Sequence, residues 1–200
     1  MHPNAAFRMS VREDAIAHVA RVGFAHLFAM TPDGPRVAHV PLLVTEAGRL
    51  RFHLANGNAL TPHLDGEPAL ASIGGPGSYI SPNWYARPAD NVPTWNYQAV
   101  EIEGQVRRLA WEELFDLLEL ASATFEPRVG ENWTMDKMDA GRRDAMMRGI
   151  TGFEMTIDSL RTTDKASQNR SEADARGVVA ALERLGDVAG AAAIRRSRGW

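Results

Sequence analysis

Hydrophobic and polar positions alternate in three runs in the first third of the chain, at residues 24–30, 36–44 and 50–55. A period of two is typical of strands that bury one face. The turn signals Thr31–Gly34 and Glu46–Gly48 separate the runs. The pattern therefore predicts an antiparallel meander of three strands.

A turn that pairs Val44 with Leu50 would place one set of hydrophobic side chains on a common face. This predicted core face consists of Ala38, Val40, Leu42, Val44, Leu50, Phe52 and Leu54. The opposite face would carry His39, Pro41, Arg51 and His53. That face is polar, so it is available to a ligand or a partner.

Helical spacing and capping signals predict the remaining elements. The S-x-x-E form of Ser10–Glu13 is a capping box and predicts a helix that ends before Gly23. Further helical segments are predicted at 56–64 with Asn58 as its cap, at 111–126, at 142–148, and after the cap Ser171. Alternation predicts further strands at 68–74, at 95–106 and at 150–160, and 165–170 should be a polar connection.

Five or six antiparallel strands with peripheral helices, and no alternation of strands with crossover helices, predict a small barrel. The expected fold class is therefore mainly β with peripheral helices, an α+β fold. Residues 1–186 should form one domain that includes a C-terminal helix. Residues 187–200 form an Ala/Arg-rich tail that we expect to be solvated or frayed.

The stretch that begins at Ile73 is rich in glycine and proline and carries Tyr79, Trp84, Tyr85 and Trp95. Loops longer than about 12–15 residues are uncommon unless they bind or cover something. Two interpretations are open: a loop that binds a planar ligand with a polar edge, or an ordered plug at one end of the barrel.

The strand after this loop has aromatic side chains on the face away from the core. Val100, Ile102 and Val106 point one way, whereas Trp95 and Tyr97 point the other. Exposed contiguous apolar patches usually mark interfaces. The pattern therefore predicts a homodimer held through this face.

Composition narrows the classes of function. The chain of 200 residues is 44% hydrophobic and 24% charged, with a formal net charge of −3, which argues against a generally basic surface for nucleic acid. The absence of cysteine excludes disulfides, thiolate nucleophiles and cysteine-ligated metals. No apolar run has membrane-spanning length, so we expect a cytoplasmic protein without membrane association. The pair His39 and His53 lacks a third metal ligand at a telling spacing, so no metal site is predicted.

Three segments closely resemble one known family. They are Gly77–Tyr85 (GSYISPNWY), Val92–Tyr97 (VPTWNY) and Ser167–Asn169 (SQN). The segments Ala38–Leu43 and His53–Asn58 fit the same pattern. In order and spacing they are similar to the FMN-binding negative transcriptional regulators, the PaiB-like family.

The resemblance implies a split β-barrel of the FMN-binding type, FMN as cofactor, and a homodimer with the flavin at its interface. It also implies kinship in fold with pyridoxamine-phosphate oxidases and flavin reductases, and a family label of transcriptional regulator. Two segments depart from the pattern. Gly57–Leu60 replaces an Ala-Asn-Pro sequence, and Thr163–Ala166 stands where Lys-Trp-Lys-Leu is typical.

FMN requires cations or backbone donors for its phosphate, hydrogen-bonding groups for its polar rim and an apolar slot for its rings. We predict ten cofactor contacts: Arg51, His53 and Asn58 at the phosphate, Trp95 and Tyr97 in the slot, Lys165, Ser167 and Gln168 at the rim, together with His39 and Asn96. His39 could equally be an interface histidine, and Arg51 a solvated strand residue. No catalytic residue is predicted.

Three hypotheses of function follow. The first is a flavin-binding protein with modest oxidoreductase activity. The second is a DNA-associated regulator, although no helix-turn-helix signal is visible and Arg195, Arg196 and Arg198 form the only concentrated basic cluster. The third is a dimeric interaction or haem-handling module that has lost flavin.

Overall fold

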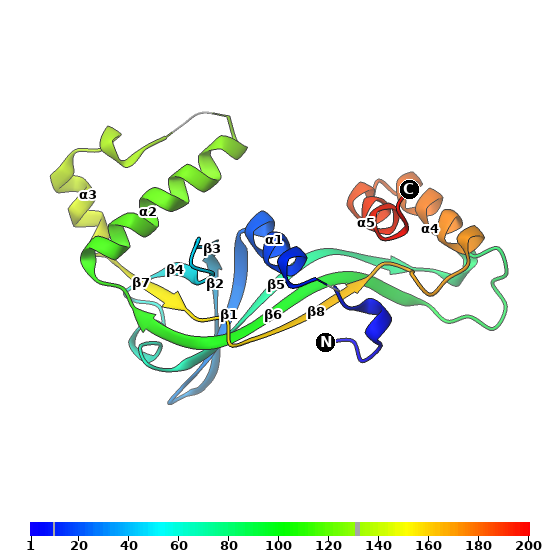
Figure 1. The fold of residues 1–200 in the computed structure, drawn as a ribbon, viewed down its shortest axis with the longest axis horizontal. Coiled ribbons are helices and arrows are strands. Elements are labelled where there is room, and N and C mark those ends of the chain that lie inside the picture. The colour runs from blue at the N-terminus through cyan, green and yellow to red at the C-terminus, as the bar shows by residue number, and fades with distance from the viewer. Residues whose placement is uncertain (10, 131–132) are drawn as a thin grey trace. The chain divides into compact units, whose positions relative to one another are not determined.

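The computed structural model describes residues 1–9, 11–130 and 133–200. In this part of the chain, eight strands form one sheet in the order β2-β1-β5-β6-β7-β4-β3, with β8 paired to β6 (Figure 1). The strands are β1 Phe24–Thr31, β2 Gly34–Pro41, β3 Leu43–Val44, β4 Leu50–Ala55, β5 Pro68–Ile80, β6 Thr94–Arg108, β7 Ile150–Met155 and β8 Ser159–Lys165. The α-helices are α1 Arg12–Val22, α2 Trp111–Phe125, α3 Ala140–Met147, α4 Glu172–Arg184 and α5 Val188–Arg198. The predicted antiparallel α+β fold is confirmed.

The chain divides into two compact units. The terminal unit comprises residues 1–15, 74–100 and 161–200, and the central unit comprises residues 16–73 and 101–160. Strands β5 and β6 contribute residues to both units. No helix in the described part of the chain is both long and apolar enough to cross a membrane.

The core of the central unit is built on the pairing of β4 with β7, which sets Phe52 opposite Phe153. Their rings stack at 5.6 Å between centroids, and both side chains are buried. The predicted pair Val44–Leu50 is confirmed. The predicted meander is confirmed only in part: residues 43–44 of the expected strand 36–44 pair with β4, whereas residues 36–41 pair with β1, and the other neighbour of β4 is β7.

A break at Leu42 explains this difference. Leu42 and Leu43 are both buried. The Leu42 amide donates to the Gly23 carbonyl at 2.9 Å and so extends the pairing with β1 by one residue, whereas Leu43 is already paired with β4; the predicted strand 36–44 thus divides into β2 and β3.

Two further strand boundaries differ from the prediction. Strand β5 continues through Ile80, so the first part of the expected aromatic loop is a strand. The expected strand 150–160 is interrupted, and its second half continues as β8 to Lys165, into the segment expected to be a polar connection. At the interruption Thr156 lies against Gly104, where a Cβ atom would come within 1.9 Å of the Thr156 carbonyl oxygen. Only glycine permits this close approach of two backbones.

The predicted helices are confirmed with shifted ends, except the one predicted at 56–64. Helix α1 ends at Val22, before Gly23, whose φ is +65°. The predicted cap Ser10 lies outside the described residues. Helices α2 and α3 match 111–126 and 142–148. The segment 56–64 contains only a 3-10 turn, Thr61–His63, with Asn58 accepting a hydrogen bond from the Leu60 amide at 3.0 Å.

In the terminal unit, α4 and α5 lie against each other (Figure 1). Ser171 caps α4 as predicted, accepting from the Asp174 amide at 3.2 Å. The expectation of a frayed tail after Gly186 is wrong, because α5 buries Ala191 and Ile194 in a cluster with residues of α4.

Candidate functional site

A pocket of about 260 Å³ lies within the terminal unit, and its walls carry mostly polar side chains. We call it the polar pocket. It is lined by His2, Asn4, Phe7, Tyr85, Val92, Thr94, Asn96, Lys165, Ser167, Asn169 and Arg170. It contains three of the ten predicted cofactor contacts, namely Asn96, Lys165 and Ser167.

Local structure brings these side chains together. Thr94 and Asn96 are two residues apart on β6, so they face the same side of the strand. Lys165 is the last residue of β8, and Ser167 follows it with a positive φ of 60°. A positive φ is unusual for a residue other than glycine. The turn at Ser167 carries the chain from β8 towards α4 along the pocket wall.

Asn96 is a buried polar side chain whose hydrogen bonds are only partly satisfied. Its Nδ2 donates to Ser167 Oγ at 2.8 Å, whereas its Oδ1 has no partner within the described residues. The hydroxyl of Tyr85 is also buried and, in the described part of the chain, unpartnered. Buried polar atoms normally have partners, so these two atoms can bond to a ligand.

Two cations share the polar pocket. Lys165 Nζ donates to Thr94 Oγ1 at 2.5 Å and lies 5.7 Å from the centroid of the Phe7 ring. Burial, followed by the charge of Arg170, lowers the pKa of Lys165. Arg170 stacks on Tyr85, with Cζ 4.5 Å from the ring centroid. Neither cation has a carboxylate oxygen within 4.0 Å among residues 1–9, 11–130 and 133–200, although the charge of Arg170 contributes to lowering the pKa of Asp174.

The C-terminal helix holds the backbone that carries these cations. Arg198 Nη2 donates to the carbonyl oxygens of Ser167 at 2.7 Å and of Arg170 at 2.5 Å. The hydroxyl of Ser197 donates to the Ala166 carbonyl at 3.3 Å. Helix α5 therefore fixes the loop between Lys165 and Arg170.

The aromatic residues predicted for the flavin slot lie on the other face of β6. Trp95 is 57% exposed and contacts Tyr79 edge-on, with 5.9 Å between ring centroids. Tyr97 is half-buried. Because neighbouring strand residues face opposite sides, the structure does not bring Trp95 and Tyr97 together with Asn96. The amide of Gln168 bonds within its own turn, to the Ala166 amide and the Asp164 carbonyl.

Arg51, in the central unit, belongs to a balanced ion-pair network. Its Nε donates to Glu154 at 2.8 Å, and Arg107 bonds both Glu154 and Glu113. Two arginines thus face two glutamates. The hydrogen bond from Arg107 is the largest cause that lowers the pKa of Glu113 to about 2.

The other three predicted contacts are also in the central unit and are not clustered around a phosphate-sized polar site. His53 lines an apolar pocket, where burial lowers its pKa. Asn58 accepts from the Leu60 amide. His39 is exposed and packs edge-on against His26, with ring centroids 4.8 Å apart.

Sequence reasoning missed Arg170, Thr94 and the N-terminal wall of the polar pocket. Arg170 directly follows the SQN motif, and that adjacency was the only signal that could have indicated it. Nothing in the sequence indicates that His2 and Asn4 approach Lys165, because these contacts connect the two ends of the chain.

The antiparallel sheet with its peripheral helices is the fold of a small split-barrel protein, and the polar pocket of this fold carries two cationic side chains. Residues 1–159 match the model of a family described as "Putative FMN-binding domain". The chain therefore belongs to this FMN-binding family, whose cofactor is FMN. Lys165 and Arg170 lie beyond the matched residues.

Known proteins support this assignment. The chain is 29% identical over 181 residues to the protease synthase and sporulation protein PAI 2 of Bacillus subtilis, covering 88% of this chain and 86% of that protein. Among solved structures, the flavocytochrome Anf3 of Azotobacter vinelandii superposes with a TM-score of 0.64 at 15% identity, covering 87% of this chain and 77% of that one. A FAD- and haem-binding protein of Mycobacterium smegmatis gives 0.60 at 13% identity, covering 86% and 79%. These two similarities show a shared fold.

Proposed function

We propose that the protein binds FMN with the flavin phosphate in the polar pocket, between Lys165 and Arg170. One observation carries the proposal: two cations share a pocket in which no described carboxylate pairs with either. Charge-assisted hydrogen bonds to a phosphate are roughly twice as strong as neutral ones. The pKa of Lys165 is lowered first by burial and then by the charge of Arg170, and a dianion would offset both effects.

The other walls of the pocket suit the same ligand. The hydroxyls of Tyr85 and Ser167 can donate to phosphate or ribityl oxygens, and the unpartnered Asn96 Oδ1 can accept from a ribityl hydroxyl. Phe7 lines the pocket beside Lys165, with its ring centroid 5.7 Å from the ammonium nitrogen. When bound, FMN supplies hydride and single-electron transfer, and the protein residues named here bind and orient it.

The pocket in one chain is small for a whole flavin. Its volume of about 260 Å³ falls below the roughly 300–1,000 Å³ of sites that enclose a cofactor-sized ligand. The flavin rings would therefore extend out of the pocket. We propose that a second copy of the chain covers them, since Trp95 and Tyr79 form an exposed aromatic pair in the same unit.

A direct role in DNA binding has less support. Arg195 pairs with Glu183, and Arg198 bonds backbone carbonyls and lies 5.8 Å from the ring centroid of Trp200. Two of the three clustered arginines therefore have structural contacts. An oxidoreductase activity is compatible with the proposed cofactor, but no described side chain can be assigned an acid or base role.

Titration with FMN and with riboflavin tests the phosphate assignment, because riboflavin has the same rings without the phosphate. Lys165→Met should weaken FMN binding at least ten-fold and leave riboflavin binding unchanged. Lys137→Met is the matched control, since Lys137 is the other lysine of the chain and lies in the central unit. Equal loss of both ligands in Lys165→Met, or none, would place the phosphate elsewhere.

Sedimentation tests whether a second copy of the chain binds, independently of where the phosphate lies. The wild-type protein should sediment as a dimer at micromolar concentration, and Trp95→Arg should shift it towards monomer. A wild-type monomer that still binds FMN tightly would contradict the shared site and leave the phosphate assignment intact.

A further inference from the structure

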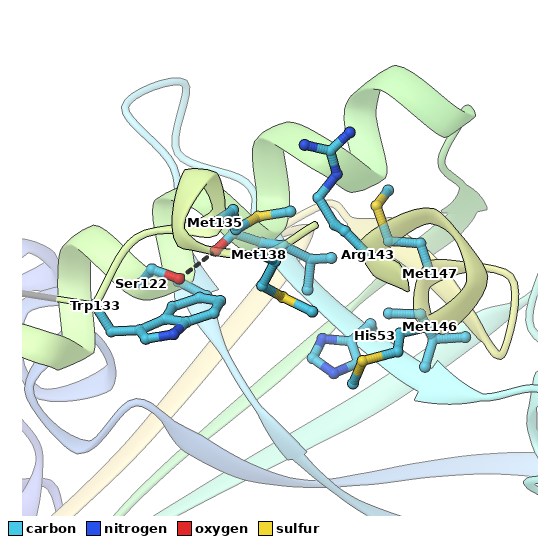
Figure 2. A pocket seen from close by; sticks show the side chains of 11 residues that line it. His53, Ser122, Trp133, Met135, Met138, Arg143, Met146 and Met147 are labelled. Atoms are coloured by element: carbon cyan, nitrogen blue, oxygen red, sulfur yellow. Dashed lines mark hydrogen bonds between the residues drawn. The ribbon is translucent and has the colours of Figure 1, made fainter. Parts of the chain in front are cut away.

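A second pocket, of about 330 Å³, lies within the central unit and differs in chemistry from the polar pocket (Figure 2). We call it the methionine pocket. Its characteristic side chains are Met135, Met138, Met146, Met147, His53 and Trp133. They come from β4, α3 and the segment between α2 and α3. Four of the eight methionines of the chain therefore line one cavity.

The floor of the methionine pocket is core, whereas its rim is exposed. Met135 and Met147 are buried in a cluster with leucines of α2. In contrast, Met146 is 61% exposed and Trp133 is 39% exposed. Large apolar side chains left at the surface around an apolar cavity mark a binding site more often than a packing defect.

Among the described lining residues, one side chain can both donate to and accept from a ligand without losing a hydrogen bond that it already makes, whereas the Trp133 indole can only donate. Ser122 donates its hydroxyl to the Leu118 carbonyl at 3.0 Å. Arg143 pairs with Asp144 and stacks on Phe115, and its guanidinium points away from His53 in Figure 2. His53 remains. Burial lowers its pKa, so at neutral pH it offers one N–H donor and one lone pair.

The walls favour an aromatic ligand. Methionine has three rotatable bonds and a polarizable sulfur, so a methionine-lined site adapts its shape and makes favourable sulfur–aromatic contacts. The Trp133 indole adds a face for stacking. The pocket has about twice the volume of a ~150 Å³ cavity that holds one benzene ring. Two fused rings therefore match its size.

We infer that the methionine pocket is a second small-molecule site, which takes a neutral, two-ring aromatic compound hydrogen-bonded to His53. Charged ligands are disfavoured because Arg143, the one charged side chain of the described lining, is already paired with Asp144. This inference is independent of the proposed FMN site, since the two pockets share no lining residue.

The probe is 2-naphthol, a neutral two-ring compound with one hydroxyl, titrated into protein that carries 13C-labelled methionine methyl groups. Saturable binding should shift the methyl signals of Met135, Met138, Met146 and Met147. The signals of the other four methionines should not move. Shifts spread over all eight signals, or no saturation, would overturn the inference.

Variants test the rim without disturbing the core. Met146→Gln and Trp133→Ala should each weaken 2-naphthol binding at least five-fold. Met30→Gln, a control at another exposed methionine of the central unit, should not change it. His53→Phe should weaken 2-naphthol but not naphthalene, which cannot form the hydrogen bond. Unchanged 2-naphthol binding in both rim variants would refute the location.

Two further ligands test the class of compound and the independence of the site. Naphthalene-2-sulfonate should bind at least ten-fold more weakly than 2-naphthol, and equal binding would overturn the preference for neutral ligands. Saturation with FMN should leave the dissociation constant of 2-naphthol unchanged. Competition between the two would show that the methionine pocket is part of the flavin site.

Discussion

The two units use the same kind of side chain in opposite ways. In the central unit, Arg51 and Arg107 face Glu113 and Glu154, so positive and negative charges balance. In the terminal unit, Lys165 and Arg170 share a pocket without a paired carboxylate among the described residues. A cation with its own carboxylate contributes to folding, whereas a pocket cation that lacks one can contribute to binding an anion.

Arg51 and Lys165 show how the partner of a cation determines its role. The position of Arg51 on the polar face of a strand predicts a phosphate contact, yet Glu154 already occupies its guanidinium. Lys165 keeps hydrogen-bonding capacity because its ammonium group has three N–H donors and Thr94 accepts from one of them. The partner of a cation, and not its place in a motif, decides which cation is available to a ligand.

A carboxylate placed in the polar pocket should make the terminal unit resemble the central one. Asn169 lines the pocket and is exposed, so Asn169→Glu should fold and pair with Lys165 or Arg170. FMN affinity should fall on the order of 100-fold, about 2.7 kcal/mol. Calorimetric titration measures the loss. Asn83→Glu adds the same charge outside the pocket and should change little. Unchanged FMN affinity in Asn169→Glu would show that a carboxylate in the polar pocket does not compete with FMN, and would contradict the difference between the two units.

Arg198 should affect FMN binding indirectly, because it holds the backbone of the pocket loop and does not line the pocket itself. Arg198→Met removes the donors to Ser167 and Arg170. We expect FMN affinity to fall roughly ten-fold, about 1.4 kcal/mol, with a smaller change for riboflavin. Arg195→Met is the control on the same helix, since Arg195 pairs with Glu183 and not with the pocket loop. A loss that is equal for both ligands would indicate general disruption of the unit.

Arg51 should show the reverse behaviour. Arg51→Gln leaves the half-buried Glu154 with one arginine partner in place of two. We expect the free energy of unfolding to fall by about 1–2 kcal/mol, with unchanged FMN affinity. Urea unfolding and FMN titration of the same sample provide both values. A stable variant with weakened FMN binding would restore Arg51 to the phosphate site.

The smallest effect concerns the pH dependence of the balanced network. The pKa of Glu113 is about 2 in the folded protein, below the ordinary value of 4.5. Its contribution is therefore fully present above pH 4.5 and is lost as the pH falls towards 2. Glu113→Gln should lower the free energy of unfolding by about 0.5–1 kcal/mol at pH 7, because the pair is near the surface. The difference from wild type should shrink with decreasing pH. A difference that does not depend on pH would show that charge is not its cause.

The sequence by itself determined the local structure. Period-two alternation placed β1, β2 and β4, helical spacing placed α2 and α4, and the cap at Ser171 set where α4 begins. These features depend on neighbours within a few residues, which is why they can be predicted from pattern. The SQN motif and Lys165 also indicated part of the polar pocket, because they are close together in the chain.

Tertiary structure alone decided how distant segments combine. The pairing of β4 with β7 joins residues about one hundred positions apart, and no local pattern specifies it. The same is true of the contact between Arg198 and the turn at Ser167, which makes the Ala/Arg-rich segment a packed helix. Availability of a side chain is likewise a tertiary property. Sequence showed that Arg51, His53 and Lys165 were polar, but only folding decided which of them met a carboxylate, an apolar wall or a ligand pocket, because each outcome depends on residues remote in the chain.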